Sequence, residues 1–289
     1  MNMICAQQHP PSTNSPPRKE VNAWCRRKFG NDWWNVDKSI KKERQANARK
    51  ALSNKPEYAD AHFELALLLV KQENFKKARK HFEKTIEINS DDAKSFFHFA
   101  LLLQAISEFE LSRENFLKAI DLDQNFADAY YHLGLLLCQL EEFEESKNNL
   151  EKATDVDQNH TLAYYHLGKL LTDPEDFEQA KKNYLTAIDI DGNFRDAHYY
   201  LGKLLKNGIK NDKDGTLVEE PDYKGAQFHF QKSIDISPDF DKAHYNLALV
   251  LNAQNQDDIA KTHFEKAIEI NSEYAKAHFH LALLLKAKK

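Results

Sequence analysis

The feature that most constrains the fold of this chain is a 34-residue period in its sequence. The segment ADAHFELALLLVKQENFKKARKHFEKTIEINSDD at 59–92 recurs as related copies at 93–126, 127–160, 161–194 and 241–274. A longer copy occupies 195–240, with an insertion at 206–222, and a half copy occupies 275–289. Because a unit of this length cannot bury its apolar face alone, neighbouring copies are expected to stack.

Each copy is predicted to form two amphipathic helices separated by a polar turn such as Gln72-Glu73-Asn74. We number the places of a copy from its first residue and leave the insertion of the long copy uncounted. Place 8 is always small, as in Ala66 and Gly134, and so is place 20, as in Ala78 and Ser112, so two helix backbones can approach closely. Apolar residues recur at helical spacing along both halves of the first copy, at Phe63, Leu65, Ala66, Leu69, Ala78, Phe82 and Ile86.

These residues and the period resemble the tetratricopeptide repeat (TPR) family. The matching places include the aromatic Phe82, Phe116, Phe230 and Phe264 and the small Ala119, Ala153, Ala187 and Ala267. The resemblance covers 59–289 and implies an all-α, right-handed superhelical solenoid of antiparallel helix pairs. It also implies a concave groove lined by places 2, 5, 6, 9, 12 and 13 of each first helix.

The first 58 residues differ from the repeats. Residues 1–19 hold four of the eight prolines and no acidic residue, which predicts a disordered tail. Residues 20–58 are predicted to form a basic helical hairpin that caps the array. Two interpretations of this segment stay open: Trp24, Trp33 and Trp34 cover the first repeat, or the segment contacts nucleic acid or an anionic surface. The side chains for such phosphate contacts are Arg26, Arg27, Lys28, Lys41 and Lys42.

Charge and composition limit the partners. Residues 1–50 carry 11 Lys/Arg and 4 Asp/Glu, whereas the remaining 239 residues carry 29 and 41. The repeats are therefore poor general nucleic-acid binders, and only residues 18–50 suit that role. The longest apolar runs, such as 65–70, are too short to span a membrane, and no secretory signal is evident. Three separated cysteines suit a reducing compartment, so we expect a cytoplasmic or nuclear protein.

The chain lacks GxxxxGK[ST], GxGxxG, GxSxG and HExxH motifs, so we predict no catalytic residue, no metal site and no cofactor. Asp-x-Asp pairs such as Asp121/Asp123 would suit a glycosyltransferase metal site, but they recur with the repeat. An alternative to a complete scaffold is therefore a non-catalytic fragment related to a TPR-bearing glycosyltransferase.

Two histidine places vary together. Copies with His62, His198 or His244 at place 4 carry His81, His229 or His263 at place 23, whereas three other copies carry Asn115, Asn149 or Asn183 there. Direct contact between the two helices would explain this covariation, and so would descent from two ancestral repeats. We favour packing over a metal site, because two imidazoles without a third ligand bind metal weakly.

The groove places that the resemblance implies point to an extended peptide ligand. Place 5 is always aromatic, and its members include Phe97, Tyr131, Tyr165, Tyr199 and Tyr245. Place 6 carries His98, His132 and His166, which would meet a peptide backbone and make binding sensitive to pH near 6–7. Lysines gather in the later copies, notably Lys169, Lys203 and Lys242, whereas Leu67, Leu101 and Leu135 lie in the earlier ones.

We therefore expect a non-enzymatic scaffold for a protein partner with apolar and acidic parts. Homodimerisation through the C-terminal helix is a further hypothesis, because Leu281, Ala282 and Leu285 keep the apolar pattern of a first helix.

Overall fold

The computed structural model describes residues 38–171, 173–210 and 217–287. The chain divides into two compact units, Met1–Gln158 and Asn159–Lys289, which we call unit 1 and unit 2. The predicted tail 1–19, the three tryptophans, Arg26, Arg27 and Lys28 lie outside the described residues. Within the described ranges, no helix combines the length and apolarity needed to cross a lipid bilayer.

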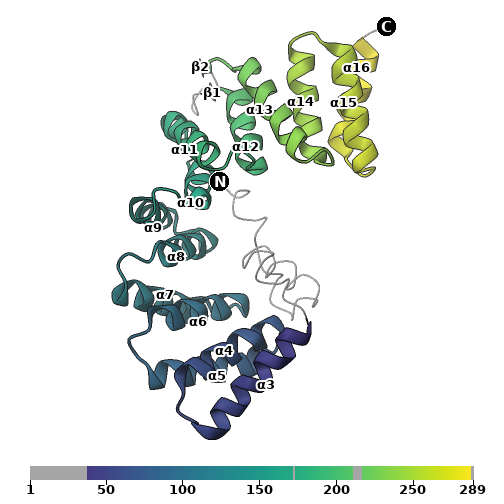
Figure 1. Cartoon of the computed structure of the whole chain (residues 1–289). Coiled ribbons are helices and arrows are strands. Elements are labelled where there is room, and N and C mark those ends of the chain that lie inside the picture. Colours follow the sequence, from purple (N-terminus) through teal and green to yellow (C-terminus); the bar gives the residue numbers. More distant parts are fainter. Residues whose placement is uncertain (1–37, 172, 211–216, 288–289) are drawn as a thin grey trace. The chain divides into compact units, whose positions relative to one another are not determined.

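Both units consist of helix pairs (Figure 1). Unit 1 contains α3 (Lys38–Asn54), then α4 (Ala59–Lys71) with α5 (Phe75–Ile88), α6 (Ala93–Ala105) with α7 (Phe109–Leu122), and α8 (Ala127–Gln139) with α9 (Phe143–Val156). Unit 2 contains α10 (Thr161–Leu170), the short 3-10 helix η2 (Pro174–Asp176) and α11 (Phe177–Ile190), then α12 (Arg195–Asn207) with α13 (Tyr223–Ile236), α14 (Asp241–Ala253) with α15 (Asp257–Ile270), and α16 (Ala275–Ala287). The predicted all-α repeat fold is confirmed.

Helix α3 precedes the first complete pair and packs against α4. Ala48 is buried with Leu65 and Leu69 in the core of this region, and Arg44 forms an ion pair of 2.5 Å with Glu64. Lys42 is exposed on α3, the helix that also contains Lys41. The helical second half of the predicted cap is thus present, and its first half falls outside the described residues.

The insertion of the long copy differs from the plain loop that the sequence predicts. Strands β1 (Ile209–Lys210) and β2 (Leu217–Glu219) pair in antiparallel fashion between α12 and α13. Gly208 turns the chain out of α12 with a φ of +60°, and a Cβ there would lie 2.3 Å from the Glu219 carbonyl oxygen. Only glycine fits this turn, and its role was not evident from the sequence.

The core of each helix pair is a contact between place 8 of the first helix and place 24 of the second. Phe82, Phe116, Phe230 and Phe264 at place 24 are fully buried. A Cβ on Gly168 would lie 2.8 Å from the Tyr184 ring, and one on Gly202 would lie 2.9 Å from the Phe230 ring. The small residue at place 8 therefore sets the approach of the two helices.

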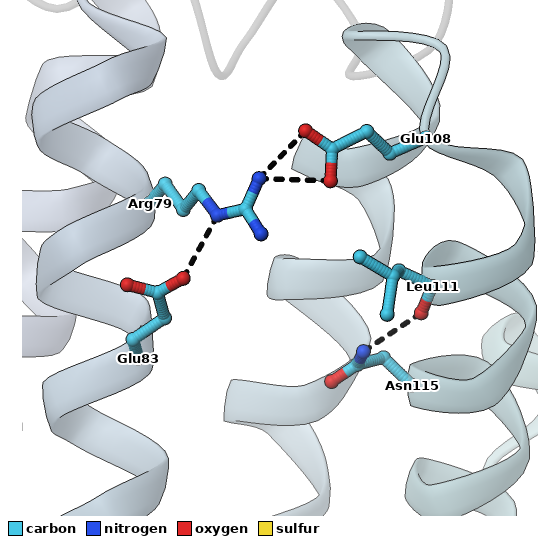
Figure 2. Close-up of polar contacts among 5 residues, drawn as sticks. All are labelled: Arg79, Glu83, Glu108, Leu111 and Asn115. Atoms are coloured by element: carbon cyan, nitrogen blue, oxygen red, sulfur yellow. Dashed lines mark hydrogen bonds and ion pairs between the residues drawn. The ribbon is translucent and has the colours of Figure 1, made fainter.

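Neighbouring second helices in unit 1 are joined by charged hydrogen bonds (Figure 2). Arg79 of α5 donates through Nη1 to both carboxylate oxygens of Glu108, at 2.6 and 2.8 Å, at the start of α7. Arg113 of α7 repeats this contact with Glu142 before α9, at 3.1 and 2.9 Å. Paired bonds of this kind orient one repeat on the next more strictly than a single point contact would.

The covarying histidines contact each other directly. The Nδ1 atoms lie 2.9 Å apart in His62–His81 and 3.0 Å apart in His198–His229 and His244–His263. Copies with asparagine at place 23 lack this bond: Asn115 of α7 donates to the Leu111 carbonyl of its own helix (Figure 2), and Asn149 of α9 does the same with Glu145. Contact between the helices therefore accounts for the covariation.

A second hydrogen bond fixes the tautomer of each place-4 histidine. Nε2 lies 2.9 Å from the Pro56 carbonyl in His62, 3.3 Å from Gly192 in His198 and 3.1 Å from Pro238 in His244. Because a carbonyl only accepts, Nε2 carries the proton and Nδ1 is an acceptor. The place-23 histidine must then donate its own Nδ1–H, so each pair is neutral at both rings.

Replacing Gly202 tests the core contact. Gly202→Ala should leave the unfolding midpoint within about 2 °C, because alanine already faces phenylalanine in three copies. Gly202→Val should lower stability by about 1–3 kcal/mol, since its branches meet the Phe230 ring. Thermal unfolding followed by circular dichroism measures both variants; equal midpoints would contradict the packing argument.

Acid should weaken the fold through the histidine pairs. Burial lowers the pKa of His81, His198, His244 and His263, and it lowers the pKa of His229 to about 4. A lowered histidine pKa means that stability is complete above about pH 6.5 and is lost as pH falls toward 4.

The double variant His244→Tyr, His263→Asn copies the Tyr130/Asn149 combination found elsewhere in this chain. It should flatten the loss of stability between pH 6.5 and 4, measured by urea unfolding at several pH values. Unchanged steepness would show that this pair contributes nothing to the acid response.

Candidate peptide-binding surface

The aromatic side chains at place 5 are mostly packed inside the repeats. Phe97, Tyr131, Tyr165, Tyr199 and Tyr245 are only 6–8% exposed. Each of the four with a described ring contact to the end of its copy reaches an aromatic at place 34, with centroid distances of 4.8–5.0 Å, in the pairs Phe97–Phe126, Tyr165–Phe194, Tyr199–Phe240 and Tyr245–Tyr274. At most the edge of such a ring is available to a ligand.

The histidines at place 6 are also partly or wholly buried. His132 lies parallel to the Phe116 ring at 6.3 Å and is 8% exposed. Burial lowers the pKa of His98 to about 4, so the expected titration of this residue near pH 6–7 is wrong. His166 belongs to unit 2, where it contacts Tyr165 edge to face at 4.9 Å.

The leucines expected to line the groove in unit 1 differ in exposure. Leu101 and Leu135 are buried, and Leu67 is half-buried. Burial of this depth places Leu101 and Leu135 in the core rather than on a surface. The more open set of predicted groove residues is that of unit 2.

Lysines from the first helices of unit 2 form one basic surface, which we call the lysine–tyrosine surface. Its cations are Lys169 of α10, Lys203 and Lys206 of α12, Lys242 of α14 and Lys276 of α16. Lys169 Nζ lies 5.4 Å from the Tyr165 ring centroid and 5.3 Å from that of Tyr200. Lys203 Nζ lies 5.2 Å from the same Tyr200 ring, which is thus shared by two cations.

The lysines of this surface repel one another. Burial first, and then the charges of Lys242 and Lys276, lowers the pKa of Lys203. Burial and the charge of Lys203 lower the pKa of Lys206 in the same direction. Within the described part of unit 2, no carboxylate forms an ion pair with these five lysines; Asp196, the acid nearest to Lys169 in electrostatic effect, is paired with Arg195 at 2.6 Å. An anionic ligand would relieve this repulsion.

Tyr200 is a residue that the sequence reasoning did not select. It stands at place 6, where the other predicted ligand contacts are histidines, yet its ring lies beneath Lys169 and Lys203. The signal was present as an aromatic at place 6 beside lysines at place 9 of two adjacent copies. Metal chemistry has no counterpart here, since no group of three or more His, Cys, Asp or Glu in the described ranges is arranged to hold a metal ion. Cys138 is disulfide-bonded with a partner outside the described residues, which does not fit the expected reducing compartment.

Comparison with known proteins assigns the fold family. The TPR repeat model matches residues 105–140, and tetratricopeptide repeat models match 59–92, 127–160, 162–194 and 241–274, together more than half of the chain. The chain therefore belongs to the tetratricopeptide repeat family, which is generally a non-catalytic scaffold for protein interactions. A search of curated protein sequences gives no match.

Solved structures with the same fold include three TPR proteins. YrrB, described as a TPR protein with an unusual peptide-binding site, is 27% identical with a TM-score of 0.56, over 69% of this chain and 96% of its own. Pseudomonas aeruginosa PilF is 17% identical with a TM-score of 0.64, over 80% and 97%. The C-terminal part of a TPR protein from Cytophaga hutchinsonii is 14% identical with a TM-score of 0.64, over 91% and 98%.

Removing one charge from the lysine–tyrosine surface should stabilise the free protein. Lys203→Gln relieves repulsion from Lys242 and Lys276 and should raise the unfolding midpoint by about 1–3 °C. Lys182→Gln, an exposed lysine on α11, serves as the control and should change little. A lower midpoint for Lys203→Gln would contradict the repulsion described above.

Proposed function

We propose that this protein is a non-catalytic scaffold that binds an extended acidic peptide on the lysine–tyrosine surface of unit 2. The observation that carries the proposal is a set of five lysines on successive first helices that share tyrosine rings and have no described carboxylate partner. Membership of the TPR family supports a protein ligand, and YrrB, the 27% identical relative, is described as having a peptide-binding site.

The spacing of the helices predicts the spacing of acidic residues in the ligand. Adjacent packed helices lie about 8–10 Å apart, and an extended peptide advances about 3.3 Å per residue. Successive lysines such as Lys169, Lys203 and Lys242 therefore suit carboxylates at every third residue of the peptide. The apolar part of the ligand would contact the exposed edges of Tyr165, Tyr199 and Tyr200, which lie beside the same lysines.

Other sequence-based hypotheses stay predictions. Contact of residues 18–50 with nucleic acid or an anionic surface rests mainly on side chains outside the described residues. No observation favours a relation to a glycosyltransferase. The fourth-place and second-helix histidines act in packing, and His98, His132 and His166 remain proposed groove residues only through the edges that they expose.

Neutralising the lysines should abolish binding of an acidic peptide. We expect a labelled peptide with Asp or Glu at every third residue to bind the full chain, with affinity that falls as salt is added. The triple variant Lys169→Gln, Lys203→Gln, Lys242→Gln should bind at least about 10-fold more weakly, since each charged contact contributes about 1 kcal/mol or more. Fluorescence polarisation measures both.

The matched control is Lys182→Gln, Lys224→Gln, Lys232→Gln, which removes the same charge from exposed places in unit 2. It should keep most of the affinity. Equal losses in the two triple variants would reduce the effect to net charge and reject a specific surface. Binding of a single-stranded RNA that is lost on deleting residues 1–50 would favour the nucleic-acid hypothesis instead.

A further inference from the structure

Helix α16 has the residues of a first helix, but two of its faces are uncovered in the structure. The leucine at place 11 is 0–6% exposed in the six earlier copies, whereas Leu285 is 45% exposed. Ala282 at place 8 is exposed too, although alanine at this place is fully buried in three other copies. These two residues form one face, and Phe279 and Leu283, which are 61% and 47% exposed, lie on another.

The complete repeats show what covers the first of these faces. In the pair α14–α15, Ala248 at place 8 and Phe264 at place 24 are both fully buried, as is Ala260 at place 20. The second helix thus supplies a ring against the small residue and its own small residue for close approach. The face of Ala282 and Leu285 has the shape and chemistry that fit such a helix.

A polar group on α16 narrows the choice of helix. His278 places Nε2 3.0 Å from the Ser272 carbonyl, the bond that His62, His198 and His244 form with their preceding repeats. As in those copies, this bond leaves Nδ1 of His278 as an acceptor. In the three complete copies the acceptor receives a proton from histidine at place 23. The matching helix for α16 therefore carries a histidine at this place.

The second helices that follow a place-4 histidine share one pattern in this chain. Ala-x-x-His-Phe-x-Lys-x-Ile occurs at 78–86 in α5, 226–234 in α13 and 260–268 in α15. It is absent from α7, α9 and α11, whose place-23 residue is asparagine. The pattern combines the small residue, the proton donor and the ring that α16 lacks.

We propose that the face of α16 formed by His278, Ala282 and Leu285 docks a helix of a partner protein with the pattern Ala-x-x-His-Phe-x-Lys-x-Ile. This interaction is independent of the acidic peptide, which binds through the lysines of unit 2. The occupant is defined by continuity with the interface that the chain itself builds in three of its repeats.

A second copy of this chain fits the face poorly. Helices α5, α13 and α15 are each packed within their own repeat, with Phe82, Phe230 and Phe264 fully buried. Helix α3 has Arg44 and Ala48 where the pattern requires alanine and phenylalanine, and Arg44 already pairs with Glu64. The predicted homodimer through the C-terminal helix is therefore an alternative outcome rather than the expected one.

The chain's own α15 provides the probe. A fluorescein-labelled peptide of residues 255–273, stapled across the exposed positions 258 and 262, should bind the full chain saturably in fluorescence polarisation. Changing Phe264→Ala in the peptide should weaken binding at least about 10-fold, because the ring fills the space over place 8. The corresponding stapled peptide from α7, with Asn115 in place of histidine, should bind more weakly than the α15 peptide.

Two variants of equal chemistry distinguish the face. Leu285→Asp should abolish peptide binding, whereas Leu283→Asp, on the other face and similarly exposed, should preserve it. Circular dichroism confirms that both variants keep their helicity. Absence of peptide binding, or equal effects of the two substitutions, overturns the proposal.

Two further results would also overturn it. If light scattering shows a dimer that Leu285→Asp dissociates, the face belongs to a second copy. If residues 256–272 appended after Lys289 stabilise the chain while the separate peptide fails to bind, the face accepts a helix only as part of the same chain. Retention of acidic peptide binding by Leu285→Asp would show that the two surfaces are independent.

Discussion

The contact of a place-24 ring with a small place-8 residue is the constraint on which the rest of this structure depends. It fixes how closely the second helix approaches the first, because a Cβ at Gly168 or Gly202 would already touch Tyr184 or Phe230. That approach determines which side chains of the first helix remain for other contacts. The aromatic residues at place 5 then pack between copies, and the lysines of unit 2 stay at a partly exposed surface above them.

The histidine pairs add a polar constraint to this apolar packing. A backbone carbonyl of the preceding repeat chooses the tautomer of His62, His198 or His244, and the chosen tautomer decides which proton the second helix must supply. Steric fit alone would accept several residues at place 23. The hydrogen bond restricts this choice, and so a complete helix of this class can be recognised by its sequence.

Much of the fold follows from the sequence, because repetition makes each pattern visible several times. The helix pairs and the contact of His62 with His81 are of this kind. Features that occur once were harder to predict: the β1–β2 pairing has strands of two and three residues, too short for an alternating pattern. The burial of His98 and Leu101 depends on stacking between copies rather than on residue type, and the shared role of Tyr200 appears only when two neighbouring lysines are placed in space.

The bond from place-4 histidine to the preceding copy has a consequence for how such an array can be assembled. The accepting residues are Pro56, Gly192, Pro238 and Ser272, which share nothing but a backbone carbonyl. A copy with this histidine therefore makes no demand on the side chains of the copy before it. Modules of this class can be duplicated, reordered or inserted by recombination without a compensating change next door, and they are suitable building blocks for arrays of chosen length.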